Sequence, residues 1–248
     1  ESLSAERLAS LVNLDIALSL PQPEVIEVEQ EFKTARSDNF IKPKKIFEDE
    51  GAQAFLSSSQ DHQGKDGIMG LVFRTPATSK NVNNLVSANL LVAAFQKKNL
   101  RIIQRAAQRG AFVIPAIDGV GNPVISMSGR TKRHIQYAND LIDKFLVFEI
   151  TERSLKDLKK QYADSYESIS ELAVADQLEY HALTITKQAP YLYSQKQFLN
   201  ALKSVTLEDV NRIHKEILES NFIDLYAHGN YNSGQILDFT KSVRNKIG

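Results

Sequence analysis

The chain has 248 residues, of which 42% are hydrophobic and 24% charged, as in an ordinary globular protein with enough apolar material for a core. Thirty basic and thirty acidic residues leave no net charge, so nucleic acid and anionic membranes are not expected as partners. The absence of cysteine excludes disulfides and thiolate metal sites, and no apolar run approaches the roughly 18 residues that a membrane-spanning helix needs.

The first 43 residues are expected to lie outside the main domain. Apolar residues spaced three or four apart over 1–20 predict a helix, which is either part of this domain or the tail of a preceding one. Prolines at 21 and 23 end it, and the charged, weakly periodic segment 21–43 indicates a linker. Because the chain begins with Glu1 and shows no signal peptide, we interpret it as a processed product or a piece of a longer protein.

Residues 44–248 are expected to form a single α/β domain. Two short apolar runs around "DEG" (49–51) predict a hairpin, and "IMGLVF" (68–73) predicts a buried strand. "AFVIPAI" and "PVISMS" predict two strands joined by the turn "DGVGN", and Pro115, which has no N–H, indicates an edge or a bulge. Residues 222–227 alternate as in a further strand.

Helical spacing predicts most of the remaining chain. One long helix is expected from about Asn81 to Arg109, with an apolar stripe through Leu85, Asn89, Val92 and Phe95 and a C-cap at Gly110. Three further helices are expected around 135–145, after an N-cap at Thr151, and over 168–187. Two more are expected to begin at capping boxes, one at Ser194 with Gln197 and one at Thr206 with Asp209, and a final helix begins at about Ser233. Taken together, these strands and helices predict an α+β two-layer sandwich, with a mostly antiparallel sheet of about six strands and helices on one face.

The five histidines do not have the spacing of a metal site. No pair stands four residues apart, so neither HExxH nor HxxEH occurs. His228 is interpreted as the end of the last strand, with Gly229 and Asn230 turning into the final helix, His181 as a core-edge residue and His62 as part of a solvated loop. The other two histidines, His134 and His214, also have no partner at metal-site spacing. The sequence therefore predicts no catalytic residue and no metal ligand in this chain, and it identifies no substrate-binding residue.

Other segments that resemble functional motifs lack the required pattern. "SMSGR" (126–130) has no first glycine for a nucleophile elbow, and "DGVGNP" lacks the spacing of a dinucleotide or phosphate loop. The basic segment "KKNLRIIQRAAQR" (97–109) is interleaved with apolar residues at helical spacing, which is typical of a solvated helix face. Tyr191 and Tyr193 are interpreted as packing residues.

The order of elements and several stretches resemble one domain of the pitrilysin/insulysin (M16) zinc metallopeptidases. The stretches are "LPQP" (20–23), "RGAFVIPAIDGVGNPVISMSGRT" (109–131), "APYLYSQKQFLNALKSVTLEDV" (189–210), "LYAHGNYN" (225–232) and "VRNKIG" (243–248). Their order best resembles the third of the family's four homologous domains, which is called here the middle domain. The resemblance covers about residues 15–248.

The resemblance implies a fold and a role. In that family the zinc site lies in the first domain and the substrate-contacting arginine and tyrosine of the C-terminal half lie in the fourth, so no catalytic residue is carried over to this chain. The expected role is a non-catalytic domain in the wall of a substrate chamber, with neighbouring domains of the same polypeptide as partners, peptide as the parent's substrate and zinc held in a different domain. The resemblance also implies a soluble, periplasmic parent.

Two alternatives stay open at this point. The chain could be an M16-like scaffold subunit of a larger assembly without peptidase activity, or a free-standing enzyme whose site the sequence does not reveal. An HxxEH domain on the same polypeptide would favour the interpretation as a domain of an active peptidase. Metal-dependent cleavage by the isolated chain would favour a free-standing enzyme.

Overall fold

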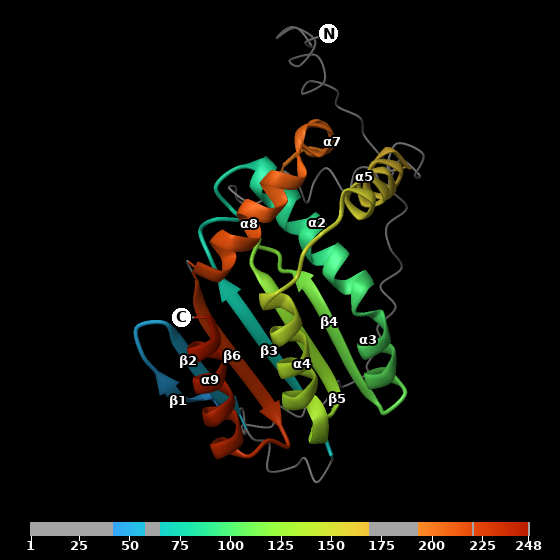
Figure 1. Ribbon diagram of the computed structural model, residues 1–248. Helices are drawn as coiled ribbons and strands as arrows, with labels where there is room; N and C mark the ends of the chain where they lie inside the picture. The colour runs from blue at the N-terminus through green and yellow to red at the C-terminus, as the bar shows by residue number, and fades with distance from the viewer. Residues whose placement is uncertain (1–41, 58–64, 169–192, 220, 248) are drawn as a thin grey trace, which may run out of the picture. The chain divides into compact units, whose positions relative to one another are not determined.

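The computed structural model describes residues 42–57, 65–168, 193–219 and 221–247, all of which fall within the unit Ile41–Gly248. The predicted helices over 1–20 and 168–187 and the linker over 21–43 lie almost wholly outside the described residues, as do His62, His181 and Tyr191. Within the described part, six strands form one mixed sheet that carries helices on one face (Figure 1). This is the α+β architecture that the sequence predicts.

The sheet has the spatial order β1-β2-β6-β3-β5-β4. Four neighbouring pairs are antiparallel, and β2 and β6 run parallel. The strands are β1 (Lys44–Glu48), β2 (Ala52–Ser57), β3 (Asp66–Arg74), β4 (Ala111–Ile117), β5 (Pro123–Arg130) and β6 (Phe222–Gly229). Pro115 lies in β4, an edge strand, where its missing N–H costs no ladder hydrogen bond on the open side.

Local signals place the hairpins and helix starts where the sequence predicts them. In the β1–β2 turn the Asp49 carboxylate accepts hydrogen bonds from the N–H groups of Gly51 (2.8 Å) and Ala52 (2.7 Å). Thr151 caps α5, and Ser194 with Gln197 forms a complete capping box on α7. The described helices are α2 (Val82–Lys98), α3 (Leu100–Ala107), α4 (His134–Leu146), α5 (Glu152–Glu167), α7 (Gln195–Ser204), α8 (Leu207–Glu219) and α9 (Ser233–Ile247), with a 3₁₀ turn η1 (Thr131–Arg133) before α4.

The predicted long helix from Asn81 to Arg109 is wrong in one respect, because it is broken at Asn99. The Asn99 side chain donates to the Phe95 carbonyl (2.9 Å), and its backbone leaves helical geometry at φ −102° and ψ 16°. An amide side chain that bonds the last turn's carbonyls offers the backbone an alternative to the helix. The second piece ends at Ala107 with Gln108 as its C-cap, so the predicted C-cap at Gly110 is wrong by two residues; Gly110 follows in the turn into β4 at φ +76°.

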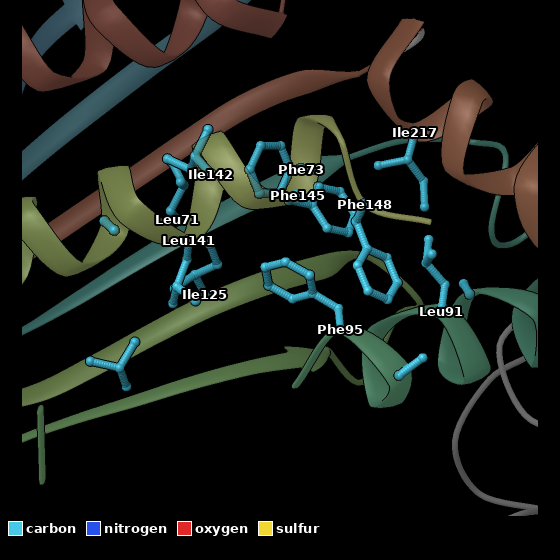
Figure 2. Packing of buried hydrophobic residues seen from close by; sticks show 14 of the residues in the cluster. Leu71, Phe73, Leu91, Phe95, Ile125, Leu141, Ile142, Phe145, Phe148 and Ile217 are labelled. Carbon is cyan, nitrogen blue, oxygen red and sulfur yellow. The ribbon is translucent and has the colours of Figure 1, made fainter. Parts of the chain in front are cut away.

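The core lies between the sheet and the helices. Helices α4 and α9 pack directly on the strands, while α2 contacts β4 on one side and α5, α7 and α8 on the other. For this reason α2 is buried on most of its circumference, and the predicted apolar stripe through Leu85, Asn89, Val92 and Phe95 is too narrow. Leu90, Leu91 and Ala94, outside that stripe, are buried, whereas Leu85 and Asn89 within it are only half-buried. Figure 2 shows the centre of this core, where Phe95 meets Phe145 and Phe148 edge to face with ring centroids 5.2 and 5.3 Å apart.

Candidate functional site: the uncovered face of the sheet

The second face of the sheet is covered by none of the described helices. Odd-numbered residues of β3, β4 and β5 point into the core, and their even-numbered neighbours point the other way. The open face is defined here as the outward residues of five strands. Two adjacent cross-strand rows form its middle: Phe112, Ser128, Ile68, His228 and Ser57, then Ile114, Ser126, Gly70, Tyr226 and Phe55.

The open face carries large apolar side chains in contact with solvent. Phe112 is 57% exposed, Ile68 56%, Ile114 50% and Tyr226 42%. The register places these four residues, from three strands, in the two rows, with Ser128, Ser126 and Gly70 between the residues of β4 and those of β3 and β6. The four exposed residues are called the patch. Several large exposed apolar side chains on one sheet face can serve as a contact surface for another protein segment.

Polar side chains border the patch at the end of the face where β3 ends. Arg74 and Asp224 form an ion pair (Nε to Oδ2 2.5 Å), and Gln53 donates to the same carboxylate at 2.6 Å. The Arg74 guanidinium also lies over the ring of Phe222, 4.7 Å from its centroid. An apolar centre with a polar, hydrogen-bonded rim is the usual anatomy of a protein–protein contact surface.

Gly70 makes a shallow opening in the middle of the patch. A Cβ atom built on Gly70 would meet no atom within 4 Å, and Gly70 lies between Ser126 and Tyr226 in its row. A side chain placed here would therefore project from the open face without disturbing the fold. A large residue substituted for Gly70 would therefore block the open face.

His228 lies on the open face, where it is half-buried in the row of Ile68 and Ser57. Among the described residues, no three His, Asp or Glu side chains come together closely enough to hold a metal ion. His214 donates its Nε2–H to the Phe145 carbonyl (2.8 Å) and packs against the Phe145 ring, so it is a residue of the core edge. Burial lowers the pKa of His214 from its ordinary value.

His134 forms a pair that the sequence did not reveal. It is fully buried at the start of α4, and its Nδ1 lies 2.6 Å from the hydroxyl of Tyr231, which follows β6. Burial raises the pKa of Tyr231, so its hydroxyl stays protonated at neutral pH, and the His134 tautomer decides which of the two groups donates the hydrogen bond. Burial also lowers the pKa of His134, against smaller opposing effects of the Ser128 backbone and Asp66. The pair fastens the β6–α9 turn to the start of α4.

A groove of about 1180 Å³ lies beside this pair, between α4 and α9. Most of its lining residues are polar or charged, and both signs of charge occur, with Lys65, Lys132, Asp140 and Asp238 among them. No nucleophile with an adjacent base and no cluster of metal ligands lines it in the described part of the chain.

The fold can now be compared with known proteins. No protein-family model matches the chain. A Caenorhabditis elegans protein described as a "Putative zinc protease" is 25% identical over 210 residues, which are 81% of this chain and 22% of the relative. This chain thus spans about a fifth of the length of that curated relative.

Solved structures agree on the architecture. The described domain has the fold of an M16-type peptidase domain. Its similarity to the crystal structure of pitrilysin has a TM-score of 0.75 at 18% identity and covers 83% of this chain but 22% of pitrilysin. A "putative M16-like peptidase" from Alicyclobacillus acidocaldarius is similar with a TM-score of 0.60 at 11% identity, over 84% of this chain and 50% of that one. None of the described helices is long and apolar enough to cross a membrane.

Proposed function

We propose that this chain is the non-catalytic third, or middle, domain of a pitrilysin-like zinc metallopeptidase and forms part of the wall of its substrate chamber. The observation that carries the proposal is the match to about a fifth of pitrilysin combined with a sequence that contains no HxxEH. A fold alone does not assign chemistry. The parent would hydrolyse peptides with a zinc-activated water held in a different domain.

The open face supports the role in a wall. A two-layer domain with helices on one side presents its other side to whatever lies beside it, and here that side carries Phe112, Ile68 and Tyr226. A neighbouring domain of the same polypeptide or a bound peptide would cover these side chains. The periplasmic location follows from the sequence resemblance alone and stays a prediction.

Two measurements test this proposal. The purified 248-residue chain should hold far less than one zinc per molecule and should not cleave a generic quenched peptide. One tightly bound zinc per chain with EDTA-sensitive cleavage would contradict the proposal and favour a free-standing enzyme. An HxxEH domain encoded on the same polypeptide is expected, whereas a full-length polypeptide without it would favour the scaffold alternative.

A matched pair of variants tests the wall role in the longer polypeptide. Gly70→Arg places a charged side chain on the open face, and Val147→Arg places one on the helix side at a position that is 79% exposed. We expect Gly70→Arg to lower peptidase activity at least tenfold and Val147→Arg to change it less than twofold, with both domains folded by circular dichroism. Equal activity of the two variants would show that the open face does not serve the peptidase.

A further inference from the structure

A buried pair of side chains joins the C-terminal helix to the rest of the domain at the end of the sheet where β6 ends. The Nδ1 atom of His134, the first residue of α4, lies 2.6 Å from the hydroxyl of Tyr231, which stands between β6 and α9. His134 is fully buried, and Tyr231 also lines the groove between α4 and α9. The pair therefore connects a buried, titratable side chain to the border of a large groove.

Two glycines let Tyr231 come close enough for this contact. A Cβ atom at Gly67 would lie 2.7 Å from Cε2 of Tyr231, and a Cβ atom at Gly229 would lie 2.7 Å from the Asp66 carbonyl oxygen. Gly229 also adopts φ +109°, which a residue with a side chain rarely takes. The Asn230 N–H donates to the same Asp66 carbonyl (3.2 Å), so the turn after β6 is held against the start of β3. These close approaches fit the turn to place the tyrosine ring beside the histidine.

A second proton on the His134 ring would disrupt the pair. Both nitrogens of an imidazolium are donors. Nδ1 can then no longer accept a hydrogen bond from Tyr231, and Nε2 carries a buried N–H for which the residues that the structure describes offer no hydrogen-bond partner. The charged ring would also be deprived of water. The closed arrangement therefore holds the neutral ring better than the charged one.

The groups that surround His134 do not remove this cost. The Ser128 backbone, from β5, and the Asp66 carboxylate, from β3, both favour the proton, but their effects are smaller than the desolvation of the buried ring, so the pKa of His134 is lowered. On its own side of the pair, the 3₁₀ turn before α4 ends in two basic residues, which carry the same sign as an imidazolium. Tyr231 supplies no negative charge, because burial raises its pKa and keeps it protonated.

A different contact ties α4 to α9 farther along the two helices. The Lys246 ammonium, near the C-terminal end of α9, lies 2.6 Å from the Asp143 carboxylate and 3.3 Å from the Asn139 side-chain oxygen. An ammonium and a carboxylate keep their charges between about pH 5 and pH 8. The helices are thus joined at one end by an ion pair and at the other by a pair that depends on the protonation of one histidine.

We propose that the His134–Tyr231 pair is a proton-operated latch: when His134 takes up a proton, the β6–α9 turn and the N-terminal half of α9 move away from α4 and open the groove between the two helices. In the opened state the ring is hydrated and has an ordinary pKa of about 6.5, so opening binds a proton below that pH. The opening equilibrium constant therefore rises by up to about tenfold per pH unit as the pH falls below about 6.5, until the closed state also titrates. The latch uses residues of this domain alone and does not depend on the proposed function.

Thiol labelling measures this local opening, because the 248-residue chain contains no cysteine of its own. Thr240→Cys reports on the N-terminal half of α9, and Ser87→Cys reports on α2. The two positions are matched, since both are fully buried and each hydroxyl donates to the carbonyl four residues earlier at 2.8 Å. Each labelling rate with dithiodipyridine is divided by the rate for Val147→Cys, at a position that is 79% exposed, at the same pH. The ratio is proportional to the population in which the buried position is open.

We expect Thr240→Cys to be labelled at least tenfold faster than Ser87→Cys at pH 5.5, because α9 opens without the core. Its rate should rise at least fivefold from pH 7.5 to pH 5.5, and this rise should be lost with His134→Gln and kept with His214→Gln. Tyr231→Phe should raise the rate at pH 7.5 several-fold, since it removes the hydroxyl from the closed pair and leaves His134 in place. Equal rates at the two cysteines, a rise that survives His134→Gln, or an unchanged rate at pH 7.5 in Tyr231→Phe would each overturn the proposal.

Discussion

The two faces of the sheet are built from the same strands, yet they differ in what covers them. On the helix side, Met69, Leu71 and Phe73 of β3 are at most 2% exposed, whereas Ile68 on the other side of the same strand is 56% exposed. Both sets are apolar, so hydrophobicity alone does not separate core from contact surface. The difference lies in whether the chain supplies its own cover, and on the open face no described helix does so.

The largest effect should come from truncating matched phenylalanines on the two sides. Phe95→Ala removes a ring that packs against Phe145 and Phe148 in the core, and we expect it to lower the free energy of unfolding by about 3–5 kcal/mol. Phe112→Ala, on the open face, should cost less than about 0.5 kcal/mol. Urea denaturation of both variants measures the contrast, and similar losses would mean that the open face is covered within the chain itself.

Two glycines of β3, one on each face of the sheet, test the difference between the covered face and the open face. A Cβ at Gly67 would come within 2.7 Å of the His228 carbonyl oxygen and of side-chain atoms of Thr131 and Tyr231. We expect Gly67→Ala to destabilise the fold by about 1–3 kcal/mol, as overpacking does. Gly70→Ala meets no atom and should stabilise it by up to about 1 kcal/mol, because it restricts the unfolded chain. Thermal unfolding distinguishes these opposite signs.

Stability should fall with acid because of two histidines on the covered side. Burial lowers the pKa values of His134 and His214 in the folded state, so the unfolded chain binds more protons below its histidine pKa of about 6.5. The free energy of unfolding is therefore highest above about pH 6.5 and decreases as the pH falls toward the folded-state pKa values of the two histidines. Each histidine contributes a slope of at most about 1.4 kcal/mol per pH unit to this decrease.

Chemical denaturation between pH 5 and 8 measures this slope. The double variant His134→Gln/His214→Gln should be less stable at pH 8 but should show a flatter dependence on pH. His228→Gln, on the open face, serves as the histidine control. A wild-type slope that the double variant retains would show that other groups cause the acid sensitivity.

The smallest effect on stability is expected on the open face itself. Ile68→Thr keeps a β-branched residue in β3 and should change the free energy of unfolding by less than about 0.5 kcal/mol. Because it removes apolar surface from the centre of the patch, it should reduce binding of a hydrophobic dye by the isolated chain. Unchanged dye binding would place the accessible apolar surface elsewhere.

Several features of this protein are determined by the sequence alone, because they depend on residues close together in the chain. The hairpin at Asp49 and the capping box at Ser194 and Gln197 satisfy backbone groups within a few residues, so their signals can be recognised without the fold. The order of such elements also carried the resemblance to the M16 family. The predicted absence of catalytic and metal-binding residues stays a prediction of the whole sequence.

Only the tertiary structure decided which faces are buried and which distant residues meet. It inserted β6 between β2 and β3, although hairpin connections alone would favour sequential neighbours. It enclosed α2 between the sheet and three helices, so the buried face of α2 is wider than the apolar stripe that the sequence predicts. It also paired His134 with Tyr231, 97 residues away in the chain. It also gathered Arg109 with Arg130 and left Ile68 uncovered. These outcomes depend on contacts between segments far apart in the chain, which local spacing and propensity do not encode.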